Sequence, residues 1–189
     1  LKGKALLTPL IENETLNEKV GDRILMKAEV LQHCGSFKFR GAYNLLSQMN
    51  PNQRKRGVLA WSSGNHAQGV ALAAKLLDIP ATILMPADAP ALKAERVRGY
   101  GATIITYDRY SEDRETIGRT LAAERGMTLA PSYDDFDIIE GQGTLALEAA
   151  CQAAELGAAF DVFITCCGGG GMTAGCATIL EEVSPATQI

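Results

Sequence analysis

The chain has 189 residues, of which 47% are hydrophobic and 21% charged, and its formal net charge is −4. This length is enough for one large domain or two small ones with a real core. The slightly acidic balance predicts no nucleic-acid partner, and the basic run at residues 54–56 is predicted to be a solvated loop.

Cysteine and histidine usage predicts no metal site, because five cysteines and two histidines show no metal-ligand spacing. The odd number of cysteines and their apolar neighbours predict reduced, buried thiols in a cytoplasmic protein. Residues 162–180 carry no charge and approach the length of a membrane span. Their central glycines and threonines favour a strand, a loop and a buried helix, so no membrane association is expected.

Apolar runs and turn residues alternate along the chain. Strands are predicted at residues 23–26, 57–61, 81–85, 102–107 and 161–166. Helices are predicted near residues 38–50, 66–77, 91–99, 111–125, 142–156 and 172–182. Prolines at 80, 86 and 90 and a glycine at 101 separate several of them. This alternation predicts an α/β fold in which a twisted parallel sheet is flanked by helices.

Lys38 stands between two aromatic residues in the run Ser36-Phe37-Lys38-Phe39-Arg40-Gly41. The aromatics favour burial, and a helix that starts at Ser36 would place the lysine near the positive end of its dipole, so both features lower its pKa. A lysine that is neutral part of the time is a nucleophile for carbonyl compounds, including the aldehyde of pyridoxal phosphate. The segment alone fits equally well a first-turn lysine that reaches water past aromatic packing.

The run Ser62-Ser63-Gly64-Asn65-His66 joins a predicted strand to an Ala-rich predicted helix. Serine and asparagine at such a junction either cap the helix or bind an anion such as a carboxylate. Taken alone, this segment favours capping. Trp61, just before it, is predicted to be a buried structural residue, with a narrowing of substrate choice as the alternative.

Four consecutive glycines, Gly168 to Gly171, lie between a predicted strand and a predicted helix. Backbone N–H groups without neighbouring Cβ atoms can surround a phosphate, and the helix adds the positive end of its dipole. A flexible turn is the weaker interpretation, because glycines are costly to order. Residues 169–174 also fit the dinucleotide-binding pattern, but the acidic residue expected about twenty positions later would fall at or past the chain end.

Four segments together resemble the signature segments of the fold-type II pyridoxal phosphate enzymes, in the branch of threonine/serine dehydratases and serine racemases. They are Ser-Phe-Lys-Phe-Arg-Gly-Ala at 36–42, Ser-Ser-Gly-Asn-His-Ala-Gln at 62–68, Glu-Gly-Gln-Gly-Thr at 140–144 and Gly-Gly-Gly-Gly-Met at 168–172. Cysteine and threonine synthases match less well, since they typically carry Asp where Phe39 stands and Thr where His66 stands.

The resemblance implies the two-domain fold-type II architecture. Residues 1–56 and 135–189 would form a large cofactor-binding domain, and residues 57–134 a small mobile domain, with 131–137 as the return linker. Members of this family continue well beyond residue 189, so the large domain is expected to be incomplete. The further part carries the group that contacts the pyridine nitrogen and, in some members, a cation site. A homodimer is the family expectation.

The resemblance also implies residue roles. Lys38 would form the Schiff base with pyridoxal 5′-phosphate and then remove the substrate α-proton, and Ser63 would be the second acid or base on the opposite face. Cofactor-binding residues would be Phe37, Lys38, Asn65, Gly168, Gly169, Gly170, Gly171 and Met172. Substrate-binding residues would be Ser62, Ser63, Asn65 and His66.

The implied activity is that of an ammonia-lyase, which converts threonine, serine or 3-hydroxyaspartate to a 2-oxo acid and ammonia. If Ser63 instead returns a proton to the other face, the same site acts as a serine or related amino-acid racemase. An alternative of another class is a non-catalytic protein that binds the cofactor or an amino acid without exchanging the α-proton.

Overall fold

The computed structural model describes all 189 residues. Its N-terminal part contains two short strands, β1 (Leu10–Glu12) and β2 (Leu25–Lys27), on either side of helix α1 (Glu14–Val20). The two strands pair antiparallel, so the strand predicted at 23–26 does not join the parallel sheet. Two 3₁₀ turns, η1 (Glu29–Leu31) and η2 (His33–Gly35), lead into the first long helix.

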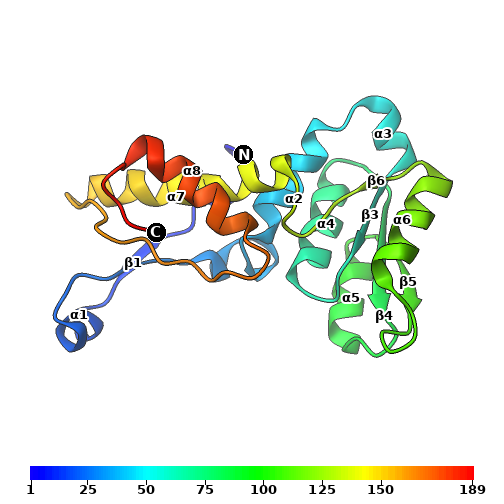
Figure 1. The fold of residues 1–189 in the computed structure, drawn as a ribbon, viewed down its shortest axis with the longest axis horizontal. Helices are drawn as coiled ribbons and strands as arrows, with labels where there is room; N and C mark the ends of the chain where they lie inside the picture. Colours follow the sequence, from blue (N-terminus) through cyan, green and yellow to red (C-terminus); the bar gives the residue numbers. More distant parts are fainter.

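Four parallel strands form the main sheet: β3 (Val58–Trp61), β4 (Ala81–Pro86), β5 (Thr103–Tyr107) and β6 (Thr128–Leu129). They are connected by α4 (Asn65–Leu76), α5 (Ala91–Gly99) and α6 (Arg114–Arg125). Helices α4 and α5 cover one face and α6 the other (Figure 1). Because both faces are covered, the central strands read as continuous apolar runs. The predicted parallel α/β architecture is confirmed.

The strand order β5-β4-β3-β6 reverses direction at β3. The chain adds β4 and β5 on one side of β3 and then returns to add β6 on the other side. In open parallel sheets, ligands bind outside the carboxyl ends of the strands at such a reversal. The segments that leave β3 and β6 are therefore the places where a site is expected.

The remaining helices are α2 (Lys38–Gln48), α3 (Pro51–Arg56), α7 (Phe136–Glu155) and α8 (Gly171–Val183). Helix α2 packs against both α4 and α7, and α7 packs along α8 (Figure 1). A Cβ atom on Gly141 would lie 2.6 Å from the Cα atom of Gly41, so α2 and α7 approach at glycine. The predicted division into a large and a small mobile domain stays a prediction.

Several sequence predictions are wrong in detail. Residues 54–56 form part of helix α3 and not a loop, because Asn50 and Gln53 make a capping box around Pro51. Residues 161–166 do not form a strand. Their backbone pairs only with the segment around Gln188, through one isolated bridge, and Ile164 is 89% exposed.

The predicted burial of the cysteines is also wrong for three of the five. Cys176, on α8, is buried, and Cys34 is half-buried, whereas Cys151, Cys166 and Cys167 are exposed. Cys166 ends the segment that was expected to be a strand and Cys167 follows it, so both are exposed because this strand does not form. All five thiols are free. No helix is long and apolar enough to cross a bilayer.

A buried ion-pair network joins the N-terminal part to α2 and α7. The guanidinium of Arg40 is fully buried and donates to Glu29 and Glu148 at 2.8 Å. Lys27 also donates to Glu148, at 2.9 Å. These carboxylates raise the pKa of Arg40 in spite of its burial, so the network is charged at neutral pH.

Candidate functional site

Residues 130–133, Ala130-Pro131-Ser132-Tyr133, form a connecting segment between β6 and α7 that touches three of the sequence-predicted site elements. Lys38 donates to the backbone of Ser132, and His66 donates to the backbone of Ala130. The ring of Tyr133 lies against Gly169. The lysine segment, the serine-rich segment and the glycine loop are therefore brought together by a segment that the sequence predicted only as a linker.

Lys38 is the first residue of α2. Its Nζ atom donates to the carbonyl oxygen of Ser132 at 2.6 Å and lies 5.2 Å from the centroid of the Phe37 ring. Burial lowers the pKa of Lys38, which confirms the predicted direction. The predicted helix start at Ser36 is wrong, because Ser36 is extended (φ −165°, ψ 158°) and Phe37 is the N-cap.

The glycine loop precedes α8. Gly170 has φ 86°, in the left-handed region that favours glycine, and Gly171 begins the helix. A Cβ atom on Gly169 or Gly171 would collide with Tyr133, whereas one on Gly168 or Gly170 would meet nothing within 4 Å. One side of the loop is therefore packed and the other is open. The first N–H groups of α8 have no intrahelical partner and can bind an anion at its N-terminus.

The segment after β3 does not cap α4 with a side chain. Gly64 is the N-cap, and Ser62 Oγ accepts a hydrogen bond from the Gly64 N–H at 3.1 Å. The capping role favoured from the sequence is therefore wrong, and the first N–H groups of α4 remain open to an anion. Asn65 is exposed at this helix end.

His66 is 3% exposed, and its Nε2 atom lies 2.8 Å from the Ala130 oxygen. Its imidazole is therefore directed into the protein, and only its backbone N–H is left for a substrate.

A cavity of about 410 Å³ lies at the reversal point of the sheet. Ser62 and Ser63 line it from the end of β3, and Ser132 and Tyr133 line it from the end of β6. Lys38, Asn65, His66 and the glycine loop are not among its lining residues. The cavity position agrees with the general rule for parallel sheets.

Helix α6 adds charged side chains to the rim of this cavity, and the sequence did not predict them. Arg114 and Arg119 both line it, and neither guanidinium forms a salt bridge within the chain. Arg119 lies 5.8 Å from the centroid of the Trp61 ring, which is half-buried and lines the cavity. Trp61 is therefore less buried than predicted. Nothing in the residue pattern of 114–119 singled out these two arginines.

The cavity also carries acidic groups, because Glu115, Asp134 and Asp135 line it as well. The Asp135 carboxylate accepts hydrogen bonds from the N–H groups of Asp137 and Ile138, so it is used as the N-cap of α7. Glu115, on α6, and Asp134, before α7, therefore remain as the lining carboxylates that accept no hydrogen bond within the chain.

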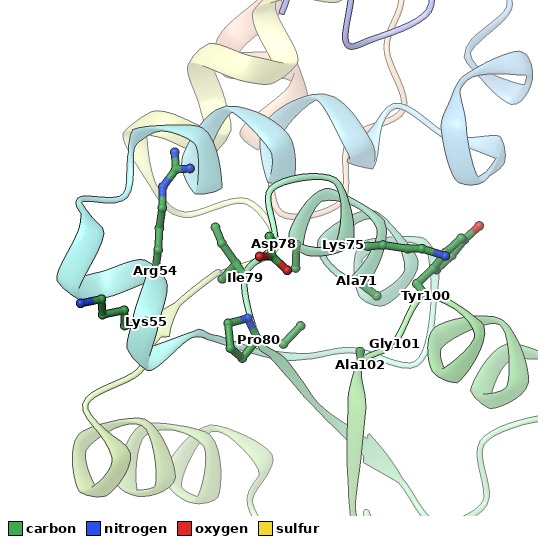
Figure 2. Close-up of a pocket in the computed structure, with 12 residues that line it drawn as sticks. Arg54, Lys55, Ala71, Lys75, Asp78, Ile79, Pro80, Tyr100, Gly101 and Ala102 are labelled. Atoms are coloured by element: carbon green, nitrogen blue, oxygen red, sulfur yellow. The ribbon is translucent and has the colours of Figure 1, made fainter.

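A second cavity, of about 700 Å³, lies at the opposite end of the sheet, where β4 and β5 begin (Figure 2). Arg54 points away from it, and its guanidinium donates to the carbonyl groups of Ser47 and Met49. Lys55 is also turned outward in Figure 2. None of the sequence-predicted site residues lines this cavity. The smaller cavity, at the carboxyl ends of the strands, is therefore the candidate active site.

The chain is similar to several known proteins. The L-threo-3-hydroxyaspartate ammonia-lyase of Pseudomonas sp is 53% identical over 98% of this chain, and the serine racemase of Schizosaccharomyces pombe is 43% identical over 100% of it. The chain spans 57% of the length of each of these relatives. The crystal structure of serine racemase from Dictyostelium discoideum superimposes with a TM-score of 0.91 at 33% identity, covering 98% of this chain and 59% of that one.

A family model described as "Pyridoxal-phosphate dependent enzyme" matches residues 3–189. The resemblance read from the four sequence segments is thereby confirmed, and the chain belongs to the family of pyridoxal-phosphate dependent enzymes.

Proposed function

We propose that this chain carries the cofactor lysine and the phosphate loop of an ammonia-lyase that acts on a β-hydroxy amino acid. The observation that carries the proposal is the convergence of Lys38, the Ser62–Ser63 segment and the glycine loop around residues 130–133. A half-buried lysine with a lowered pKa is the nucleophile that this chemistry needs.

The residues present fit pyridoxal phosphate. The open side of the glycine loop and the N-terminus of α8 suit the phosphate, because Gly168 and Gly170 leave space and free N–H groups there. Lys38 suits the aldehyde, with Phe37 beside it. When bound, the cofactor supplies an electron sink that stabilises negative charge at the substrate Cα atom.

The proposed roles of the protein groups follow from their positions. Lys38 would bond to the cofactor and later take the α-proton, and Ser63 would hold a second proton from its place in the cavity. The open N-terminus of α4 would bind the substrate carboxylate. The substrate loses its α-proton and β-hydroxyl as water, and a second water replaces the nitrogen. The products are a 2-oxo acid and ammonia, without an oxidant or reductant.

We propose 3-hydroxyaspartate as the preferred substrate. Its second carboxylate suits the two unpaired guanidinium groups of Arg114 and Arg119 on the rim of the cavity. Serine and threonine lack this group. The relatives from Pseudomonas sp and from Saccharomyces cerevisiae, 53% and 50% identical, are both named L-threo-3-hydroxyaspartate ammonia-lyase, which supports the choice.

Racemisation of serine or a related amino acid is the second candidate function. The hydroxyl of Ser63 in the cavity favours it, because a proton donor other than Lys38 is needed to return a proton to the opposite face. The serine racemase of Schizosaccharomyces pombe, 43% identical, supports this alternative.

One experiment separates these functions. L-threo-3-hydroxyaspartate, L-threonine and L-serine are incubated with the protein and pyridoxal phosphate in heavy water, and proton NMR follows the substrate and the product. A 2-oxo acid formed fastest from hydroxyaspartate supports the proposal, whereas deuterated amino acid without 2-oxo acid supports the racemase. Binding of cofactor without α-proton exchange in any substrate would contradict both and support a non-catalytic protein.

A companion experiment tests the role of Lys38. Borohydride reduction in the presence of pyridoxal phosphate is expected to leave the cofactor on the peptide that contains Lys38. The Lys38→Ala variant should show no adduct there, and an adduct at the same site in this variant would refute the assignment. We also propose a homodimer, as the resemblance implies, and sedimentation of the purified protein tests it.

A further inference from the structure

The imidazole of His66 is buried and has no role in the chemistry proposed above. Its Nε2 atom lies 2.8 Å from the carbonyl oxygen of Ala130, and its Nδ1 atom is buried without a hydrogen-bond partner. Because a carbonyl oxygen only accepts, Nε2 carries the proton and Nδ1 is a bare acceptor. Burial, aided by the nearby charge of Lys38, lowers the pKa of His66 to about 4 in spite of the bond to Ala130. The ring is therefore neutral near pH 7.

Two hydrogen bonds and a proline restrain the start of the connecting segment. The N–H of Ala130 donates to the carbonyl of Leu59 in β3 at 2.9 Å, and its carbonyl accepts from His66. Pro131 follows, which fixes its own φ and restricts Ala130 to extended conformations. The bond from His66 thus holds the start of a short, restricted segment, two residues before the carbonyl of Ser132 that accepts from Lys38.

Helix α4 is linked to both the backbone and the side-chain amine of Lys38. A Cβ atom on Gly69 would lie 3.1 Å from the carbonyl carbon of Lys38, so the backbone of α4 is in close contact with the backbone of Lys38. Gly69 is three residues after His66, which places the two on the same side of the helix. The same side of α4 thus contacts the lysine backbone directly and reaches its ammonium group through Ala130 and Ser132, which accepts from Nζ at 2.6 Å.

We infer that His66 is a positioning residue for Lys38. Its neutral imidazole fixes the connecting segment, so that the Ser132 carbonyl holds the lysine amine where it captures the cofactor aldehyde. In that capture the amine nitrogen bonds to the aldehyde carbon and the aldehyde oxygen leaves as water. The inference rests on the proposed function, because it requires Lys38 to be the lysine that bonds the cofactor.

The test compares covalent capture of pyridoxal phosphate by the cofactor-free wild-type protein and three variants. Absorbance follows the capture, and borohydride trapping with peptide mass analysis locates it. His66→Leu removes the donor and is expected to weaken capture about tenfold, which corresponds to one hydrogen bond of about 1.4 kcal/mol. His66→Gln retains an N–H close to the Nε2 position and is expected to stay within about threefold of wild type.

Val70→Ala is the matched control. Val70 is fully buried on the same helix and has no polar side-chain atom, so its truncation lowers stability without removing a donor. Urea unfolding of the variants shows how much stability each one has lost. Capture by Val70→Ala is expected to equal that of wild type. Capture by His66→Leu is expected to be weaker than wild type even if both variants have lost a similar amount of stability.

The pH profile gives a further readout. From about pH 6 to pH 9 the wild-type protein should show only the rise that comes from deprotonation of Lys38, because His66 stays neutral throughout. A second step in this pH range would overturn the inference. So would capture by His66→Leu that is unchanged or stronger, or capture by His66→Gln or Val70→Ala that is weakened as much as in His66→Leu. If the wild-type protein forms no adduct at Lys38, the proposed function fails and the inference fails with it.

Discussion

Replacement of Gly171 by alanine is expected to damage the fold and the proposed cofactor site together. The new Cβ atom would lie 2.6 Å from the carbonyl oxygen of Tyr133, so that oxygen must move by about 0.8 Å to reach an ordinary contact of 3.4 Å. Ser132 is the preceding residue, and its oxygen lies 2.6 Å from Lys38 Nζ. An equal shift of the Ser132 oxygen away from Nζ would lengthen that bond to about 3.4 Å, near the limit of hydrogen bonding.

Three contributions set the expected free-energy change. Overpacking costs about 1 to 3 kcal/mol, and loss of a hydrogen bond to a charged group costs about 1.5 to 3 kcal/mol. Alanine recovers at most about 1 kcal/mol, because it is a better helix former than glycine. We therefore expect Gly171→Ala to lower the free energy of unfolding by about 1.5 kcal/mol or more, as measured by urea denaturation.

Gly168→Ala is the matched control for stability. A Cβ atom there meets nothing within 4 Å, and the residue is exposed, so the unfolding free energy should change by less than about 0.5 kcal/mol. The added methyl group would still enter the open side of the loop, and cofactor binding should weaken. Equal unfolding free energies for Gly171→Ala and Gly168→Ala would refute the packing argument, whatever the cofactor affinities.

Two further predictions concern the buried network and the rim of the cavity. Burial alone would raise the pKa of Glu148, but hydrogen bonds from Arg40 and Lys27 hold it below its ordinary value. The stability that these hydrogen bonds contribute is therefore present above about pH 4.3 and is lost as pH falls through the folded-state pKa. Arg40→Met should therefore cost about 3 to 5 kcal/mol at pH 7 and less in acid, and equal costs in urea unfolding at both pH values would contradict this reasoning. Gly118→Ala places a Cβ atom 2.5 Å from the Trp61 ring and should shift the emission of this single tryptophan. It should also lower the kcat/KM ratio of hydroxyaspartate to serine, and an unchanged ratio would count against a role for α6 in substrate choice.

Local sequence could predict the features of the fold and the site that are determined by neighbouring residues in the chain. Two aromatic neighbours and an expected helix start predicted that the pKa of Lys38 is lowered, and burial, which the aromatics indicated, is the cause in the structure. Apolar runs bounded by turn residues were enough to locate β3 and β4, because these central parallel strands are buried on both faces. The edge strand β5 was located from its β-branched residues and the preceding glycine, although only Tyr107 in it is buried.

The parts that local sequence did not predict depend on pairing across the fold. Strand β6 has only two residues and is defined by its pairing with Val58 and Leu59. The segment at 161–166 has the composition of a strand, but an apolar run needs a neighbouring ladder to become one, and here it has a single bridge. Ser132 contributes a backbone carbonyl, which any residue supplies, so no pattern of side chains could have singled it out.

The connecting segment explains why the site requires both halves of this chain. Its first residue continues the pairing with β3 through Leu59, and its last residue lies against the glycine loop before α8. A displacement of the glycine loop therefore shifts the position of Tyr133, and a displacement of the sheet shifts that of Ala130. The Ser132 carbonyl, which contacts Lys38, lies between these two residues. Pro131 limits how far Ala130 and Tyr133 can move independently. Perturbations at Gly171 and at His66 should therefore both alter the position of the Lys38 amine, although Gly171 and His66 lie on different helices.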